Sequence, residues 1–228
     1  MKNSGKARKA AFKMILVTLV LVLLVPIIGL LATVLGGAMV AVSFFIFLAW
    51  VIFALFTLYF FRDPNPKVPV GPNLVVSPGH GKVDVIDVTT EPKFMGGECR
   101  RVSIFLSVLN VHVQNAPIGG KVAFFKYTEG EFMNAMRTEC ATANENVLFG
   151  FQASQPDGAK VGLRLIAGVL ARRIVPWVEL GDEVARGDRI SLIQFGSRCD
   201  TYLPMSAKIN VKLGDRVVGG ETVLAILE

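Results

Sequence analysis

The apolar residues of this chain are concentrated near its N-terminus. From Met14 to Phe61 no charged residue occurs, whereas charged residues recur throughout the rest of the sequence. A helix that crosses a bilayer needs about 20 apolar residues, so this run has room for two helices. We predict a first helix over about Met14–Val34 and a second over about Ala38–Phe60, with Gly36-Gly37 in a tight connection between them.

Two other interpretations of the apolar run are a cleaved signal peptide and a hairpin buried in a globular core. The apolar core of a signal peptide has about 7–15 residues and is much shorter than this run. We therefore favour a membrane hairpin, in which Pro26 is positioned to kink the first helix.

The net charge of +6 comes almost entirely from the N-terminal region. Residues 1–61 contain no acidic residue and these basic ones: Lys2, Lys6, Arg8, Lys9 and Lys13. Because the rest of the chain is close to neutral, the charge does not indicate nucleic-acid binding. Basic residues flanking a span stay on the cytoplasmic side, so two spans return the chain to the cytoplasmic face of the cell (inner) membrane.

The rest of the chain, residues 62–228, is predicted to be one mainly β domain that follows the basic N-terminus and hairpin of residues 1–61. Four prolines in "FFRDPNPKVPVGPN" exclude a helix directly after the hairpin. Beyond it, short apolar runs alternate with Gly- and Pro-containing turns, and "RVSIFLSVLNVHVQNAP" forms one long β-branched and aromatic run. This pattern favours an all-β sandwich or barrel.

An internal repeat refines this fold prediction. "VELGDEVARGDRISLI" begins at Val178 and "VKLGDRVVGGETVLAI" begins at Val211, and each has a Gly-Asp turn before an apolar strand. Two such copies resemble the barrel-sandwich hybrid of biotinyl and lipoyl carrier domains. We therefore expect a lipoyl-like β domain with a minor α component, preceded by an N-terminal transmembrane helical hairpin.

One β-like segment, "SLIQFGSRCDTYLP", is interrupted by Gly196-Ser197. Glycine inside a strand usually marks a bulge or a close approach of the backbone. The nearby Cys199, like Cys99 and Cys140, lacks metal-ligand spacing, so we expect free thiols and no metal site.

Longer motifs extend over almost the whole soluble part of the chain. They are "FFRDP", "VVSP", "SIFLSVLNVHV", "NAPIGGKV", "GEFMNA", "NEN", "IAGVLARRIV" and "FGSRCDTYLP". Together they resemble the short bacterial and archaeal form of phosphatidylserine decarboxylase, a pyruvoyl-dependent lyase made as a proenzyme. The apolar hairpin before "FFRDP" fits the same family.

The resemblance implies autocatalytic serinolysis at Gly196-Ser197. The Ser197 hydroxyl would attack the Gly196 carbonyl, which requires an activated nucleophile and a stabilised oxyanion. Elimination and hydrolysis would then leave a pyruvoyl group at position 197. The zymogen would thus become a β chain, residues 1–196, and an α chain, residues 197–228.

The pyruvoyl group derived from Ser197 is the cofactor that the resemblance implies. In the family it forms a Schiff base with the substrate amine and accepts electrons as carbon dioxide leaves. The implied activity is decarboxylation of phosphatidylserine to phosphatidylethanolamine in phospholipid biosynthesis. Expected partners are this lipid, the membrane and the two chains of the proenzyme, with a homo-oligomer left open and no nucleic acid.

The chain has two histidines, His80 and His112. The resemblance assigns reprotonation during decarboxylation to His112 of "NVHV". His80 stands where the family usually has Asp, and Asn115 stands where long-form members have a second His. For the base that activates Ser197, three hypotheses stay open: His80 itself, another group such as Glu145, or slow or absent self-cleavage.

Further polar residues have weaker assignments. Asn144 and Glu145 match a family loop and, with Asn115, are candidates for support of the site, although Asn144-Glu145 could also be an ordinary polar turn. Asp84 and Asp87 follow the His80 turn, and we expect them to line a solvated strand face.

Two alternative functions remain at this stage. One is an uncleaved, membrane-anchored adaptor or binding module with a lipoyl-like barrel, in which Lys208 would be the acceptor lysine of a carrier domain. The sequence around Lys208 lacks the flanking pattern of such carriers. The other is a degenerate family member that folds and binds lipid without turnover.

Overall fold

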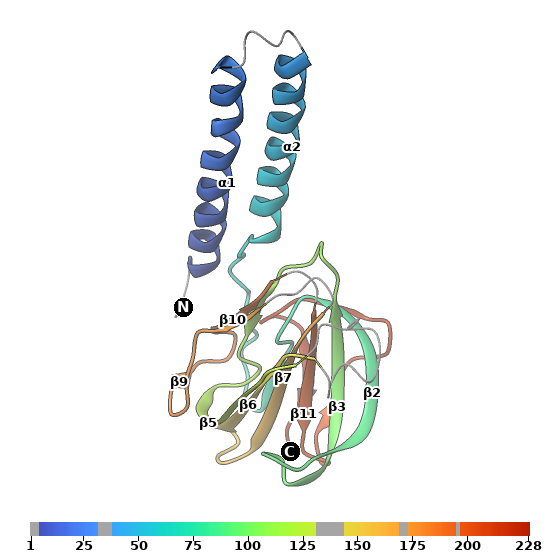
Figure 1. Ribbon diagram of the computed structural model, residues 1–228. Coiled ribbons are helices and arrows are strands. Elements are labelled where there is room, and N and C mark those ends of the chain that lie inside the picture. The colour runs from blue at the N-terminus through green and yellow to red at the C-terminus, as the bar shows by residue number, and fades with distance from the viewer. Residues whose placement is uncertain (1–4, 32–37, 131–143, 169–172, 195–196) are drawn as a thin grey trace. The chain divides into compact units, whose positions relative to one another are not determined.

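The computed structural model describes residues 5–31, 38–130, 144–168, 173–194 and 197–228. The described residues divide into two units, one over residues 5–63 and the other over residues 64–228. The first unit is a pair of helices and the second is built from β-strands (Figure 1).

The helical unit contains α1 (Lys6–Leu31) and α2 (Ala38–Phe60). α1 begins at Lys6 rather than near Met14, because Lys, Arg and Ala favour helix as well as the apolar residues that follow. Pro26 lies inside α1, and the predicted Gly36-Gly37 connection is outside the described residues.

Both helices are long and apolar enough to cross a membrane, and most of their residues are not buried. Large apolar side chains such as Leu21, Ile27 and Phe44 are more than half exposed, which does not fit a hairpin buried in a soluble core. The helices are linked by a hydrogen bond from Trp50 Nε1 to Thr18 Oγ1 of 3.1 Å. Such polar contacts stabilise helix pairs in apolar surroundings.

The strands of the second unit are β1 (Leu74–Val76), β2 (Gly81–Glu91), β3 (Gly97–Leu106), β4 (Val113–Asn115), β5 (Gly120–Thr128), β6 (Asn146–Ala153), β7 (Lys160–Ala167), β8 (Ile174–Pro176), β9 (Glu183–Val184), β10 (Arg189–Ile193), β11 (Ser197–Leu203), β12 (Lys208–Ile209), β13 (Arg216–Val217) and β14 (Val223–Ile226). The prediction of a mainly β domain is confirmed.

Most strands belong to one curled antiparallel sheet with the order β13-β2-β3-β11-β7-β6-β5-β9 (Figure 1). Two smaller sheets have the orders β1-β14-β12 and β4-β10-β8. β11 is central in the large sheet, because it pairs with β3 on one side and β7 on the other. The segment that begins with Ser197 is therefore held by both neighbours.

The curled sheet encloses the apolar core on its inner face. Alternate residues of its strands are fully buried there, including Ile104, Leu106, Phe149 and Leu165. Burial of each such side chain contributes about 1.5–3 kcal/mol, so this layer dominates the stability of the unit.

The internal repeat is confirmed as a structural repeat. Gly181 and Gly214 adopt left-handed φ angles of 94° and 92°, and the following Asp182 and Asp215 each accept a hydrogen bond from the backbone N–H three residues earlier. Glycine tolerates this conformation because it has no Cβ. The short strands that follow, β9 and β13, form the two opposite edges of the large sheet.

The long apolar run that contains "NVHV" is not one strand. β3 ends at Leu106, and a turn follows in which the Asn110 side chain accepts hydrogen bonds from the N–H and hydroxyl of Ser107. Asn favours such local bonds over sheet pairing, which ends the strand. His112 consequently lies just before β4. The long β-branched and aromatic run had instead suggested a position within a strand.

Candidate functional site

The predicted cleavage site lies where the chain passes from one sheet to another. β10 ends at Ile193 in the sheet β4-β10-β8, and β11 begins at Ser197 in the large sheet. Ser197 pairs with Leu106 of β3 and with Ala167 of β7. Gly196, the other half of the predicted scissile bond, is outside the described residues.

The Ser197 side chain faces the core side of the sheet. Cys199 and Leu203, which share its face by the alternation of β11, belong to the apolar core. Ser197 is fully buried, and its Oγ has no hydrogen-bond partner among the described residues. An unsatisfied buried hydroxyl costs about 1–3 kcal/mol, and the buried hydroxyls of Ser191 and Thr201 also have no partner among the described residues, so this feature does not by itself mark Ser197 for chemistry.

The turn that carries His80 packs on this same face. The Ser77 hydroxyl donates to the Gly79 carbonyl over 2.6 Å and closes the turn. A Cβ added to Gly79 would lie 3.4 Å from Cys199 Sγ and 3.3 Å from Leu106 Cδ2. The structure therefore brings the His80 turn against β11 close to Ser197.

His80 and Asn115 lie together around Gly219. A Cβ on Gly219 would be 2.9 Å from His80 Cδ2 and 2.9 Å from Asn115 Oδ1. The Asn115 backbone N–H donates to the Pro78 carbonyl over 2.8 Å, which joins "NVHVQN" to the His80 turn. The Asn115 side chain is also fixed, because its Nδ2 donates to the Gly187 carbonyl over 2.9 Å.

His112 is fully buried beside the end of β10. Its Nδ1 lies 2.9 Å from the Asn110 carbonyl oxygen, which can only accept, so this assignment makes Nδ1 the protonated nitrogen. In a neutral ring Nε2 then carries no proton. The Ile193 N–H donates to the His112 carbonyl over 3.1 Å, which places His112 next to the chain that leads to Ser197.

Asn144 and Glu145 contact the strand partner of Ser197. Asn144 Nδ2 donates to the Ala167 carbonyl over 2.7 Å, and the Ala167 N–H donates to the Glu145 carbonyl over 3.0 Å. The Glu145 carboxylate accepts the Ile174 N–H over 2.9 Å. Both residues are buried and bind backbone, so they are placed to fix the strand beside Ser197.

Two residues near the site, Asp84 and Arg198, form a contact that was not predicted from the sequence. Asp84 and Asp87 are exposed, as expected for a solvated strand face, but Asp84 also forms an ion pair with the nearly buried Arg198, which was not predicted. Asp87 pairs with Arg101 over 2.6 Å. Arg198 directly follows Ser197 in "GSR". Its burial could not be predicted from the sequence, because it depends on the strands that lie beside β11 in the sheet.

Cys199 is a free thiol, as expected. It is fully buried, and burial raises the pKa of its thiol well above the ordinary value, with the nearby Asp200 adding to the shift. A thiol that stays protonated is a poor nucleophile.

The described residues thus place a buried serine at the junction of two sheets, with two histidine-bearing segments nearby. The phosphatidylserine decarboxylase family model matches residues 53–225. A phosphatidylserine decarboxylase proenzyme of Desulfotalea psychrophila is 46% identical over 169 residues, which are 74% of this chain and 78% of that protein. One of Symbiobacterium thermophilum is 40% identical over 198 residues, which are 84% of this chain and 91% of that protein.

The chain therefore belongs to the phosphatidylserine decarboxylase family. Proenzymes of this family are carboxy-lyases that carry a pyruvoyl group made from their own chain, so the predicted enzyme class and cofactor are confirmed. The position of Lys208 does not suit the acceptor lysine of a carrier domain, because Lys208 begins the strand β12 and does not lie at the tip of a turn.

Proposed function

We propose that this protein is a membrane-anchored proenzyme that cleaves itself between Gly196 and Ser197 and then decarboxylates phosphatidylserine to phosphatidylethanolamine. The family supports the activity. The observation that supports the cleavage site is the position of the buried Ser197 at the start of β11, where the chain passes from the sheet β4-β10-β8 to the large sheet and the His80 turn packs on the same face. The products are a β chain of residues 1–196 and an α chain of residues 197–228.

Cleavage begins when Ser197 Oγ attacks the Gly196 carbonyl and loses its proton to a base. The C–N bond breaks as the new ester forms, and elimination then leaves the Gly196 carboxylate and a dehydroalanine at position 197. Water converts this residue to the pyruvoyl end with loss of ammonia. His80 is the proposed base, because its turn packs on the face from which Ser197 projects.

Glu145 is the second candidate for the base. Its carboxylate already accepts the backbone N–H of Ile174 in β8, and its backbone carbonyl accepts the Ala167 N–H of β7, so it is better placed to hold these strands beside Ser197 than to move a proton. Asn115 and Asn144 have positioning roles in the same proposal, since both bind backbone carbonyls next to the site.

The two chains stay together after cleavage without a covalent link. Three strands of the α chain pair with strands of the β chain: β11 with β3 and β7, β13 with β2, and β14 with β1. Position 197 is therefore held on both sides after the bond to Gly196 is lost.

The residues around position 197 fit a pyruvoyl group, because its precursor side chain is buried and otherwise unengaged among the described residues. When formed, this group supplies a carbonyl that binds the substrate amine and withdraws electrons from the carbon that loses carbon dioxide. His112 returns a proton to that carbon from Nε2, while the Asn110 carbonyl fixes the ring through Nδ1. The buried setting excludes bulk water from this step.

The finer features of the fold and location belong to the same proposal. α1 and α2 form a transmembrane hairpin, and the β unit is a lipoyl-like barrel-sandwich on the cytoplasmic side of the inner membrane. The basic N-terminus supports this orientation. Protease added to intact spheroplasts should leave the β unit uncut. Digestion of the β unit before lysis would contradict this orientation.

Intact mass spectrometry of the purified protein in detergent tests the cleavage. We expect a fragment of residues 197–228 with a mass that fits a pyruvoyl end, and an uncleaved chain for Ser197→Ala. His80→Ala should slow the conversion by about 10²–10⁴-fold if His80 is the base. Normal conversion of that variant would exclude His80, and an uncleaved wild type would favour the degenerate family member.

A further inference from the structure

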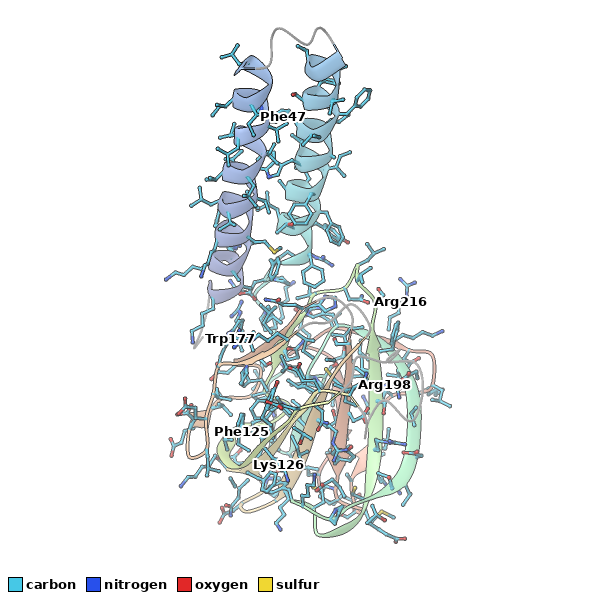
Figure 2. All side chains as sticks on the ribbon, viewed as in Figure 1. Phe47, Phe125, Lys126, Trp177, Arg198 and Arg216 are labelled. Atoms are coloured by element: carbon cyan, nitrogen blue, oxygen red, sulfur yellow. The ribbon has the colours of Figure 1, made fainter. Side chains whose placement is uncertain are left out.

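The residue after the proposed nucleophile forms an ion pair on the opposite side of the sheet. Ser197 faces the core, so Arg198 projects from the other face of β11 by the alternation of the strand. Figure 2 labels Arg198 in the β unit. The Arg198 side chain is only 4% exposed, and its Nη2 pairs with Asp84 Oδ2. The charge next to the cleavage site is therefore buried and has a specific partner.

Asp84 reaches Arg198 because β2 is bulged at this point. The register with β3 shifts between Val83 and Val85, so that Asp84 is the extra residue. A bulge re-aims a side chain relative to a regular strand. The ion pair thereby spans β3, which separates β2 from β11 in the sheet order, and the long Arg198 side chain covers most of this distance.

The same strand also begins at the His80 turn. β2 starts at Gly81, directly after His80, and the bulge at Asp84 follows closely. Gly79 packs against Cys199 on the inner face of β11, and Asp84 binds Arg198 on the outer face. One short segment of the β chain thus contacts both faces of the strand that carries Ser197.

We propose that the Asp84–Arg198 ion pair, called the clasp below, fixes the position of Ser197 relative to the His80 turn for self-cleavage. This inference rests on the proposed cleavage at Gly196-Ser197. After cleavage, the same pair links the β chain to the second residue of the α chain and holds the pyruvoyl-bearing end in place. Asp84 and Arg198 are positioning residues, since neither faces the core side where Ser197 projects.

Loss of one partner should misplace Ser197 without unfolding the sheet. Loss of Asp84 removes one of the two carboxylates near the buried Arg198 charge, the other being Asp200, so we expect the Arg198 side chain to move and to shift the start of β11 with it. Misplacement by about 1 Å can slow a reaction about a hundredfold, so even partial movement should be measurable.

The test is the rate of self-cleavage of the full chain in detergent, followed by intact mass spectrometry. We expect Asp84→Asn and Arg198→Met each to cleave at least about tenfold more slowly than wild type. The double variant should be no slower than the slower single variant, because both changes remove the same contact. Arg198→Lys, which keeps the charge, should recover most of the rate.

Asp87→Asn is the matched control, because it removes another ion pair of β2, the one that Asp87 forms with Arg101 of β3, away from Ser197. It should cleave at the wild-type rate. Each variant is also placed in the uncleavable Ser197→Ala chain, where unchanged thermal unfolding would show that slow cleavage does not come from a lost fold.

Single variants that cleave at the wild-type rate, or a double variant whose slowing is the product of the two, would overturn the clasp while leaving the proposed function intact. Slowing by Asp87→Asn equal to that of Asp84→Asn would also overturn it. An uncleaved wild type would overturn the proposed function and the clasp together.

Discussion

Gly219 offers a direct way to disturb the proposed base without touching it. A Cβ at this position would lie 2.9 Å from His80 Cδ2, 3.1 Å from His80 Nε2 and 2.9 Å from Asn115 Oδ1. Ordinary carbon contacts begin at about 3.4–3.5 Å, so Gly219→Ala must displace these side chains by about 0.5 Å. Both contacts are with side-chain ends, so the backbone need not move, although the Asn115 side chain must shift against its hydrogen bond to the Gly187 carbonyl.

The expected effect on cleavage follows from this displacement. At about a hundredfold loss of rate for 1 Å of misplacement, 0.5 Å corresponds to about tenfold slower self-cleavage. The time course of the fragment 197–228, measured by intact mass spectrometry of newly made protein, gives the rate. Thermal unfolding in the Ser197→Ala background reports whether the fold is kept.

Gly97→Ala is the matched control. Gly97 begins β3, and a Cβ there would meet nothing within 4 Å, so the same substitution should leave cleavage unchanged. If Gly219→Ala cleaved as fast as Gly97→Ala and wild type, then the position of the His80 ring would not limit cleavage, and His80 could not be the base in its present place.

Three further predictions concern the proton donor, the core and a buried carboxyl. His112→Ala should still yield the fragment 197–228 but lose decarboxylation by about 10²–10⁴-fold, measured as carbon dioxide release from phosphatidylserine in mixed micelles; loss of cleavage instead would contradict its assigned role. Phe149→Ala should lower the free energy of unfolding by about 3–5 kcal/mol, because this ring is fully buried and packs on Phe125 and Phe151; a thermal scan that matches wild type would contradict the assigned core. Burial raises the pKa of Asp200, although nearby Arg198 and Arg101 oppose the shift. The folded state therefore favours the protonated carboxyl. The contribution of this carboxyl to the free energy of unfolding is fully present below the ordinary pKa of 3.8 and is lost as pH rises through the raised pKa. Unfolding of Ser197→Ala chains between pH 3 and 8 should therefore show a smaller decline with rising pH for Asp200→Asn, and equal declines would contradict the shift.

Much of the fold was predictable because its causes are local. The charge-free run before Phe61 predicted two long apolar helices, and the Gly-Asp repeat predicted two matching turns whose glycines have left-handed φ angles. The boundaries were less certain. α1 starts earlier than the apolar run because basic residues also favour helix, and the "NVHV" run breaks because Asn110 forms a local turn.

The residues of the candidate site were also predicted only in part. Ser197 and His112 were found through motifs, and the role of His80 was a hypothesis based on a substitution in a motif. Their roles stay predictions. Asp84 was expected on a solvated face, since nothing in "KVDVID" indicates a bulge that turns a carboxylate toward another strand.

The sequence by itself determined the apolar helices, the β character of the second unit and the family to which the chain belongs, because periodicity, turn residues and motifs are local properties of the chain. Only the tertiary structure decided that Ser197 starts a central strand, that the His80 turn packs on its face and that Asp84 pairs with Arg198. These contacts join residues far apart in the sequence. They depend on strand order and register, which are set by the packing of the whole sheet and not by any one segment.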